Sequence, residues 1–525
     1  MDVDASQYAE ISREMANSND FLHIYDRGRD YLDKPPMLFW TAALSMKAFG
    51  ATPFAYKLPS ILVALLAIYA TYRLARLLYS ENTARLSALV LATCQGFFLW
   101  TNDVRTDMML AGFVVTGMWC LREFEVRRRW YFLVGGAFAL ACGMMTKGPI
   151  ALLVPIFAFG IDRVLRRKWK QLFSPWHLVT LSLIAIFLIP MCIGLYQQFD
   201  MHPEKWIDGK QGTSGLKFYF WTQSFGRITG ENTWNNGADP FFLLNSMSWA
   251  FLPWTLLFLA ALFINLRKLV KRRFRLLHGQ EFVSTGGFVL TYLALCMSRY
   301  QLPHYILVAF PLAAIMVGRL LRHMLVTKTY PRLSQIFTGV QTLISALLLL
   351  AALAIITLVF PAGRLVLLLW AAGFALWLFI SLKNKKGQRL LWTSVAGIII
   401  ANVFLTHFFY YPLLRYEVGP IVGKYIHSRQ IPEGHVRTYR VEDPLNALHF
   451  YARMVVPQVD ETPTGNSGDY LLLMDKDLHL LDSMQRPYEV VLDGELFKVT
   501  ELTPEFLNLH TRHKATKPWS LVQLH

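Results

Sequence analysis

Long apolar runs alternate with short basic or polar connections through most of the chain. A run of about 18 or more mostly apolar residues can cross the hydrocarbon core of a bilayer as an α-helix. Twelve such runs predict an all-α polytopic membrane protein, with a transmembrane domain over residues 56–414. The predicted spans lie near 56–79, 85–102, 106–124, 130–149, 149–165, 177–199, 239–266, 282–299, 303–321, 336–360, 364–383 and 389–414.

The connections between these spans differ in charge. With twelve spans threaded in order, the basic connections all fall on one side, which the positive-inside rule predicts to be the cytoplasm. They are Arg122 with residues 127–129, and residues 166–170, 267–275, 319–332 and 383–389. The other side receives residues 102–107, 146–149, 298–305, the long loop 200–238 and both chain ends. We therefore expect an inner (plasma) membrane protein whose polar loops face the periplasm.

The two ends of the chain differ from the apolar middle. Residues 1–55 form a predicted first periplasmic loop, in which "DVDASQYAEISREM" has an amphipathic helical pattern. No apolar segment or signal peptide precedes this loop, so we expect a first span to be missing from the chain. Residues 415–525 contain the strand patterns "GDYLLLMD" and "YEVVLDGELFKVTEL", and "EDPLNALHFYARM" predicts a helix with Asp443 near its start. They predict a small periplasmic α/β domain.

Composition narrows the class of protein further. Hydrophobic residues make up 54% of the 525, and the formal charge of +17 is concentrated in the connections between spans, so it does not indicate nucleic-acid binding. All five cysteines lie in apolar runs, without the spacing of metal ligands, which argues against a disulfide framework or a cysteine zinc site.

Two of the polar stretches predicted on the periplasmic side lie in the first loop. Asp4 and Glu10 belong to the amphipathic stretch, which is also the pattern of a solvated surface helix. In "YLDKPPMLFW", Pro35 and Pro36 end regular structure and hold Lys34 just before an apolar segment. Such a lysine can extend to lipid headgroups in general, or it can bind one lipid phosphate as a compact charge.

Two further polar stretches lie between spans. "NDVRTDMML" places Asp103, Arg105 and Asp107 in a very short loop, as a functional cluster or as a locally neutralised turn. "SRYQLPHYI" places Arg299, His304 and Tyr305 between two apolar runs, where a histidine is structural or contacts an anionic headgroup.

Together these stretches collect carboxylates that could accept a proton and cations that could hold phosphate. A general base must lie within hydrogen-bond reach of an acceptor hydroxyl, and cations stabilise charge on a leaving phosphate. The pattern favours a transferase that uses a lipid-phosphate donor. No P-loop, GxGxxG or HExxH motif indicates nucleotide or zincin chemistry.

The ordered motifs "DASQYAEISREM", "YLDKPPMLFW", "RTDMML", "MTKGPIALL" and "LPHYIL" resemble the lipid-linked-sugar glycosyltransferases of the GT-C fold. The nearest group is the bacterial family of aminoarabinose transferases and protein O-mannosyltransferases. This resemblance covers residues 1 to about 414. It implies about thirteen spans, a site in periplasmic loops, and attack of an acceptor hydroxyl on a polyprenyl-phosphate sugar with inversion at the anomeric carbon.

The resemblance also implies roles for individual residues. Asp4 matches the catalytic aspartate of the first loop, and Asp107 matches a second functional carboxylate. Positions near the donor phosphate are matched by Tyr31, Lys34, Arg227 and Tyr305, with His304 and Arg299 beside them. The chain differs from the family's usual residues at three places. Ala5 stands where the family usually has a glutamate, and Gln7 where it often has an arginine. Gln223–Ser224 stands where the aminoarabinose transferases have an acidic residue followed by a histidine.

The resulting prediction is a glycosyltransferase that takes a sugar from an undecaprenyl-phosphate donor. Its acceptor is a hydroxyl or phosphate of lipid A, of another envelope glycan or of a protein. We expect no metal or other cofactor. A transporter or flippase of lipid-linked saccharides is the alternative, although the chain shows no two similar halves. A membrane scaffold would leave the periplasmic carboxylates unexplained.

Overall fold

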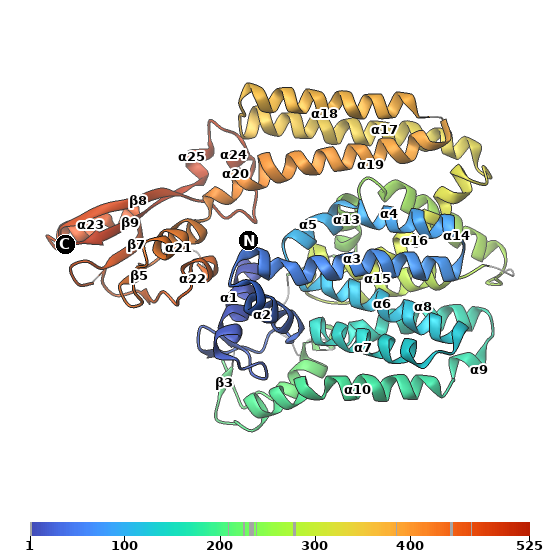
Figure 1. The fold of residues 1–525 in the computed structure, drawn as a ribbon, viewed down its shortest axis with the longest axis horizontal. Helices are drawn as coiled ribbons and strands as arrows, with labels where there is room; N and C mark the ends of the chain where they lie inside the picture. Colours follow the sequence, from blue (N-terminus) through green and yellow to red (C-terminus); the bar gives the residue numbers. More distant parts are fainter. Residues whose placement is uncertain are drawn as a thin grey trace.

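The computed structural model describes residues 3–207, 209–223, 226–229, 236–237, 239–276, 280–384, 386–441, 445–463 and 465–525. Most of them are helical, and the long helices run side by side (Figure 1). Helices α1 (Val3–Ser18) and α2 (Met37–Phe49) lie at one end of this bundle, together with the C-terminal sheet. The polar ends of the chain are therefore collected at one end of an apolar body.

The main helices between residues 53 and 405 are α3 (Pro53–Leu78), α4 (Glu81–Ala92), α5 (Gln95–Asn102), α6 (Thr106–Arg127), α7 (Trp130–Lys147), α8 (Ile150–Leu165), α10 (Trp176–Leu195), α13 (Phe242–Ala250), α14 (Thr255–Lys271), α15 (Val283–Cys296), α16 (Phe310–Leu325), α17 (Pro331–Ala354), α18 (Arg364–Lys383) and α19 (Lys386–Leu405). Shorter helical segments join them: α9 (Trp169–Leu172), η1 (Tyr196–Asp200), α11 (Gly215–Lys217), η2 (Phe218–Thr222), α12 (Gly226–Thr229), η3 (Pro303–Ala309), η4 (Ile355–Val359), η5 (Thr406–Tyr410), α20 (Tyr411–Leu413) and η6 (Leu414–Tyr416).

Six helices in the described part are long and apolar enough to cross a membrane, or seven if the bent pair α5 and α6 is one span. Some of the predicted spans correspond to shorter helices. The segment predicted near 85–102 consists of α4 and α5, with an extended residue, Cys94, between them. The segment predicted at 149–165 is the 16-residue helix α8. The count of twelve spans stays a prediction.

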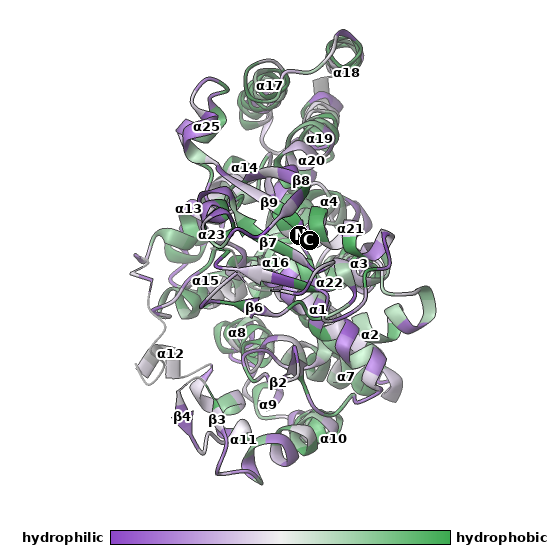
Figure 2. Cartoon of the chain, turned by 90° about the vertical axis from the view of Figure 1, so that its left-hand side faces the viewer, coloured by the Kyte–Doolittle hydropathy of each residue, from purple (hydrophilic) through white to green (hydrophobic). Residues whose placement is uncertain are grey.

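Apolar side chains cover the outside of the bundle as well as its interior. The ends of helices α17 and α18 that face the viewer in Figure 2 are coloured mainly as hydrophobic, and Leu343 and Leu365 are 60% and 70% exposed. Helix α16, in contrast, is enclosed by its neighbours and contacts α4 closely. A Cβ on Gly318 would lie 2.7 Å from the backbone nitrogen of Ser87, so glycine permits this close approach.

The C-terminal part contains a five-stranded sheet in the order β6-β5-β7-β9-β8. Strand β5 is parallel to β6 and β7, and β9 is antiparallel to β7 and β8. The strands are β5 (Val436–Tyr439), β6 (Gln458–Val459), β7 (Tyr470–Met474), β8 (Tyr488–Leu496) and β9 (Lys517–Leu524). The accompanying helices are α21 (Val418–Ser428), α22 (Asn446–Ala452), η7 (Asp475–Asp477), α23 (Leu478–Ser483), α24 (Pro504–Leu507) and α25 (Arg512–Ala515).

The two quoted strand patterns correspond to β7 and β8, and the quoted helix pattern corresponds to α22. Asp443 lies outside the described residues. Two small hairpins, β1 (Tyr25–Asp26) with β2 (Arg29–Asp30) and β3 (Trp206–Ile207) with β4 (Lys210–Gln211), lie in the polar loops. The division at residues 55 and 414 into three domains stays a prediction.

Helix α1 is buried between α2 and α22, so the solvated surface helix considered from its pattern is wrong. Arg13 donates to both carboxylate oxygens of Glu10, at 2.8 Å from Nε and 2.5 Å from Nη2. Its Nη1 donates to the backbone carbonyl of Arg453, just after α22, at 3.0 Å. Glu10 and Arg13 are only 1% and 8% exposed. The buried Arg13 guanidinium, oriented by Glu10, therefore joins the first loop to the C-terminal part.

We predict that Arg13→Ala destabilises the protein. The change leaves the Glu10 carboxylate buried without its cation, a loss typically of about 3 kcal/mol. Thermal unfolding of the purified protein measures the effect, and proteolysis should reach the C-terminal part earlier. Arg453→Ala is the matched control, because it keeps the accepting carbonyl. Equal melting temperatures for Arg13→Ala and the unsubstituted protein would contradict this role.

Candidate active site

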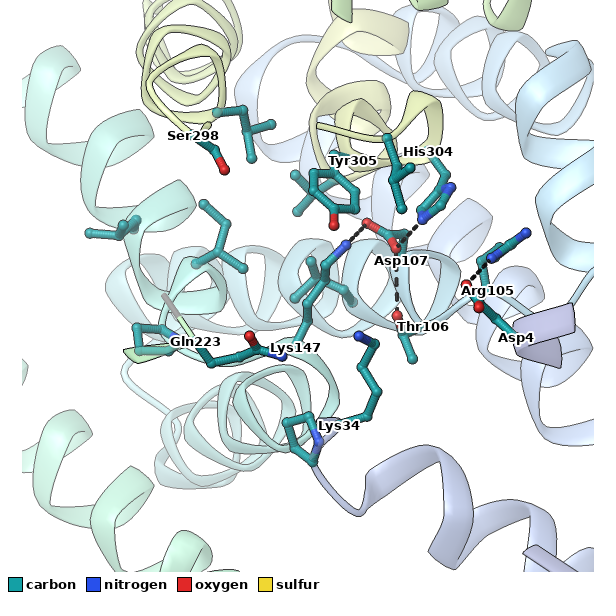
Figure 3. Close-up of a pocket in the computed structure, with 18 of the residues that line it drawn as sticks. Asp4, Lys34, Arg105, Thr106, Asp107, Lys147, Gln223, Ser298, His304 and Tyr305 are labelled. Carbon is teal, nitrogen blue, oxygen red and sulfur yellow. Dashed lines mark hydrogen bonds and ion pairs between the residues drawn. The ribbon is translucent and has the colours of Figure 1, made fainter. Parts of the chain in front are cut away.

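A cavity of about 160 Å³ lies at the end of the bundle beside α1 and α2. Its walls come from α1, the segment before α2, the corner between α5 and α6, the ends of α7 and α15, and η3. The polar lining residues are Asp4, Tyr8, Lys34, Arg105, Thr106, Asp107, Lys147, Gln223, Ser298, His304 and Tyr305 (Figure 3). The remaining wall is apolar and includes Leu110, Ile150, Leu153, Leu295, Leu302 and Val308. One cavity thus joins a charged cluster to an apolar surface.

The corner between α5 and α6 positions the first part of this cluster. The two helices are bent by 118° relative to each other, with Val104 in a left-handed conformation between them. Arg105 follows the corner; its Nη1 donates to Asp4 Oδ2 at 2.6 Å and its Nε to Asp103 Oδ2 at 2.7 Å. A single guanidinium therefore fixes the position of the α1 carboxylate relative to α6.

Asp107, in the first turn of α6, is 1% exposed and lies among three polar neighbours (Figure 3). Lys147 Nζ donates to its Oδ1 at 2.6 Å. Its Oδ2 lies 3.5 Å from both His304 Nε2 and Thr106 Oγ1. Because both carboxylate oxygens have partners, Asp107 is held in one orientation at the base of the cavity.

Lys147 is the last residue of α7, which ends there because Gly148 follows with φ of +89°. A cation at a helix C-terminus interacts favourably with the helix dipole. Its Nζ also lies 3.6 Å from the centroid of the Tyr305 ring, a cation–π contact. The ammonium group is thus positioned by Asp107 and Tyr305 together, at the wall of the cavity.

Lys34 approaches the same space from the segment before α2. Its Nζ donates to Asp33 Oδ2 at 2.6 Å. Gln223 donates to Asp33 Oδ1 and to the Asp33 carbonyl, at 2.8 and 2.6 Å. The long loop after α10 is therefore connected to the first loop beside the Lys34 ammonium group.

Asp4 differs from Asp107 in its exposure. Its side chain is 46% exposed, so a molecule in the cavity can contact its second oxygen. Partial burial raises the pKa of Asp4 above its ordinary value of 3.8; Asp33 adds to this effect, whereas Lys34 and Lys147 oppose it. A carboxylate with a raised pKa is a stronger base, and this one is accessible.

Comparison with known proteins shows which families the chain is similar to. Residues 33–193 match the family of dolichyl-phosphate-mannose-protein mannosyltransferases. An undecaprenyl phosphate-alpha-4-amino-4-deoxy-L-arabinose arabinosyl transferase of Edwardsiella ictaluri is 30% identical over 327 residues, which are 60% of this chain and 54% of that protein. A transferase of the same name from Pseudomonas paraeruginosa is 26% identical, over 71% of this chain and 67% of its own length.

The fold has a close match among solved structures. ArnT from Cupriavidus metallidurans, solved with undecaprenyl phosphate bound, superposes with a TM-score of 0.71. The alignment covers 93% of this chain and 91% of ArnT at 19% sequence identity. The chain resembles the bacterial GT-C glycosyltransferases of the ArnT and protein mannosyltransferase type. The family resemblance predicted from its motifs is confirmed, and the matched region spans about half of the Edwardsiella transferase.

Within this GT-C framework, the structure places five of the eight predicted site residues around one cavity: Asp4, Lys34, Asp107, His304 and Tyr305. Tyr31 lines a smaller neighbouring cavity, which shares Lys34 and Gln223 with the first. Arg299 is exposed and is not among the residues that line the main cavity. Arg227 belongs to α12, but its side chain is outside the described part, as is all of Ser224.

Two basic residues that line the cavity were not assigned from the sequence. Lys147 occurs in the quoted motif "MTKGPIALL", and its predicted place on the periplasmic side was the signal that could have identified it. Arg105 was noted in its loop without a role. Sequence spacing alone could not show that Arg105 contacts Asp4, which lies 101 positions earlier.

The carboxylates Asp4 and Asp107 are paired with Arg105 and Lys147, and His304 contacts Asp107. Among the described residues, no three His, Cys, Asp or Glu side chains are arranged to hold a metal ion. Gln223 occupies the position where the ArnT subgroup was expected to carry an acidic residue, and it binds Asp33.

We predict that Asp107→Asn and Lys147→Met each destabilise the protein by about 3 kcal/mol, because each leaves a buried charge without its partner. The double variant should lose less than the sum of the two, and a double-mutant cycle of unfolding free energies measures that coupling. Lys34→Met is the matched control. Its ion pair has the same 2.6 Å length but is 17% and 24% exposed, so its loss should be smaller. Strictly additive effects would contradict a coupled pair.

Proposed function

We propose that this chain is an integral membrane glycosyltransferase, which transfers a sugar from a polyprenyl-phosphate donor to an acceptor hydroxyl group. The observation that carries the proposal is the convergence of Asp4, Lys34 and Lys147 on one cavity with an apolar wall. The names of the relatives support the donor class, because the matched transferases use undecaprenyl phosphate-linked aminoarabinose. The ArnT structure with undecaprenyl phosphate supports it as well.

The two lysines would hold the donor phosphate. Their Nζ atoms reach the cavity wall from different elements, and both side chains are mostly buried, at 17% and 18% exposure. A cation in such a site is only weakly screened by water, so it interacts strongly with an anion. The apolar wall beside them, including Leu110, Ile150 and Val308, suits the first isoprene units of the lipid.

Asp4 is the better candidate for the general base. Asp107 is buried and both of its oxygens are engaged, by Lys147 and by His304 with Thr106. The accessible Asp4 oxygen would accept the proton of the acceptor hydroxyl as its oxygen forms a bond to the anomeric carbon. The bond from that carbon to the phosphate oxygen breaks, and its electron pair leaves with the polyprenyl phosphate. Attack from the face opposite the phosphate inverts the anomeric carbon.

The other site residues would position these groups. Arg105 holds Asp4 through its 2.6 Å hydrogen bond, and Asp107 holds Lys147. Tyr31 remains a neutral phenol, because burial raises its pKa well above 10. Undecaprenyl phosphate is the proposed carrier. Lipid A, another envelope glycan and a protein side chain remain the proposed acceptor classes.

We predict that Asp4→Asn lowers turnover by about 10²–10⁴-fold, the usual contribution of a positioned base, while donor binding is retained. Lys34→Ala should weaken donor binding as well, since that cation contacts the phosphate before and during the reaction. Mass spectrometry of envelope glycolipids and glycoproteins, in cells lacking the gene and complemented with each variant, measures transfer. Binding of undecaprenyl phosphate to the purified variants measures affinity.

The control for this pair is Glu461→Gln, which removes an exposed carboxylate that does not line the cavity and should leave both readouts unchanged. The unsubstituted enzyme should become faster as pH rises through a pKa above 3.8, because Asp4 must be ionised to accept a proton. Asp4→Asn should lose that dependence. Near-normal turnover of Asp4→Asn would transfer the role of base to Asp107.

We further propose a topology of about twelve spans in the inner (plasma) membrane, with the cavity and residues 415–525 on the periplasmic face. The polar elements at one end of the bundle support this orientation, as does the basic loop between α16 and α17 at the other end (Figure 1). The prediction is that a membrane-impermeant thiol reagent labels Ser467→Cys in intact cells with a permeabilised outer membrane. Thr329→Cys, in the basic loop, should react only after lysis.

Ser467 and Thr329 are both exposed, so they are matched in access to the reagent. The unsubstituted protein supplies the background, since its five cysteines lie in apolar segments. Labelling of Thr329→Cys in intact cells, with Ser467→Cys protected until lysis, would reverse the proposed orientation.

A further inference from the structure

A second and larger cavity, of about 490 Å³, lies between helices α6, α7, α8 and α10. It is at the far end of the bundle from α1, next to the short helix α9 (Figure 1). Its apolar wall consists of Leu121, Leu133, Leu140, Leu152, Pro155, Ile156, Phe159, Leu181 and Ile184. None of the lining residues belongs to the first cavity. The proposed sugar transfer therefore does not involve this second cavity.

The end of the cavity nearest α9 is basic. Four cationic side chains line it, namely Arg122, Arg128, Arg163 and Lys170, against one carboxylate, Glu125. Arg122 Nη1 donates to Glu125 Oε2 at 2.6 Å, and Arg163 also forms an ion pair with Glu125. Because one carboxylate cannot neutralise four cations, the lining retains a positive charge.

One hydrogen-bond observation points to an oxyanion site. Arg163 Nη1 already has a partner, because it lies within hydrogen-bond distance of His177 Nε2 at 3.2 Å. Arg122 Nε is buried and has no hydrogen-bond partner among the described residues. A buried donor without an acceptor is costly, and an oxyanion beside Arg122 would satisfy it.

The basic end opens into a smaller polar cavity of about 200 Å³. The two cavities share Arg122, Glu125 and Arg163. The smaller one adds the cations Arg166 and Lys168 and the carboxylates Asp162 and Glu281, so the excess of cations lies mainly in the larger cavity. The arginine cluster thus stands between an apolar chamber and a polar one. A phospholipid is divided in the same way, into apolar acyl chains and a polar headgroup.

The apolar chamber also has access to the bilayer. Ile156 and Leu181 line it and are 56% and 47% exposed, so neighbouring helices leave these side chains largely uncovered. Trp176 lines it too, and Trp169 and Phe173 lie close by in sequence with largely exposed rings. Aromatic side chains of this kind are enriched where a membrane meets water.

We propose that this cavity binds an anionic phospholipid of the surrounding bilayer. The phosphate would contact Arg122 and Arg163, a polar headgroup would extend into the smaller cavity, and an acyl chain would occupy the apolar chamber between α8 and α10. Basic pockets between membrane helices on the cytoplasmic side bind such headgroups. A soluble anion would leave the apolar wall empty, and a zwitterionic lipid would leave the excess positive charge unmatched.

The test measures lipid binding to the full chain in detergent, by native mass spectrometry with phosphatidylglycerol and phosphatidylethanolamine. The unsubstituted protein should prefer phosphatidylglycerol. Arg122→Gln and Arg163→Gln should each weaken that binding about fivefold, and the double variant more than either single variant, with little change for phosphatidylethanolamine. Arg129→Gln is the matched control, because Arg129 is exposed on the same side and lines neither cavity.

A second variant tests the chamber without altering charge. A Cβ on Gly160 would meet no atom within 4 Å, so Gly160→Phe can project into the cavity without a backbone clash. It should abolish the preference for phosphatidylglycerol, whereas Gly160→Ala should retain it. Unfolding temperatures without added lipid show that each variant is folded.

Three results would overturn the proposal. Equal affinity for both phospholipids would remove the role of charge, and unchanged binding in Gly160→Phe would place the lipid elsewhere. Tighter binding of undecaprenyl phosphate than of phosphatidylglycerol, abolished by Gly160→Phe, would assign the cavity to the polyprenyl carrier. Loss of sugar transfer in Asp4→Asn has no bearing on this test, so the two proposals can fail separately.

Discussion

The buried ion pair between Asp107 and Lys147 holds the site together. It joins the first turn of α6 to the last residue of α7, and His304 contacts the same carboxylate from η3. Two charges removed from water are stable only when they face each other with their hydrogen bonds satisfied. The pair therefore fixes three elements relative to one another at the end of the bundle, and Lys147 is presented to the cavity in one orientation.

From this pair, the arrangement extends outward through Arg105 to Asp4. The two aspartates are chemically identical, but their surroundings give them different properties. Asp107 is enclosed and has partners on both oxygens, whereas Asp4 is half exposed. A carboxylate of the first kind positions a cation, and one of the second kind can exchange a proton with a bound molecule. Helix α1 can present Asp4 only because α2 and α22 bury its other faces.

The two cavities lie at opposite ends of the helix bundle, and the balance of charged residues differs between them. At the end near α1, lysines lie close to carboxylates and the cavity admits a charged donor beside an apolar wall. At the end near α9, arginines exceed carboxylates and another apolar wall follows. In both cavities, cationic side chains lie near the ends of the helices, next to an apolar wall. Amphiphilic ligands suit such boundaries, because one site then satisfies both halves of the molecule.

The sequence by itself determined the class of fold and predicted a side of the membrane for each loop, and five of the eight residues it proposed for the site line one cavity. Apolar runs of span length admit little except membrane helices, and the ordered motifs carried the family resemblance. Only the tertiary structure decided which residues meet. Arg105 contacts Asp4 across 101 positions and Lys147 contacts Asp107 across 40, while Arg299 is exposed and does not line the cavity. A one-dimensional pattern gives the face of each helix but not the crossing and bending that bring distant helix ends together. The 118° corner between α5 and α6 and the burial of α1 therefore had to be seen in three dimensions.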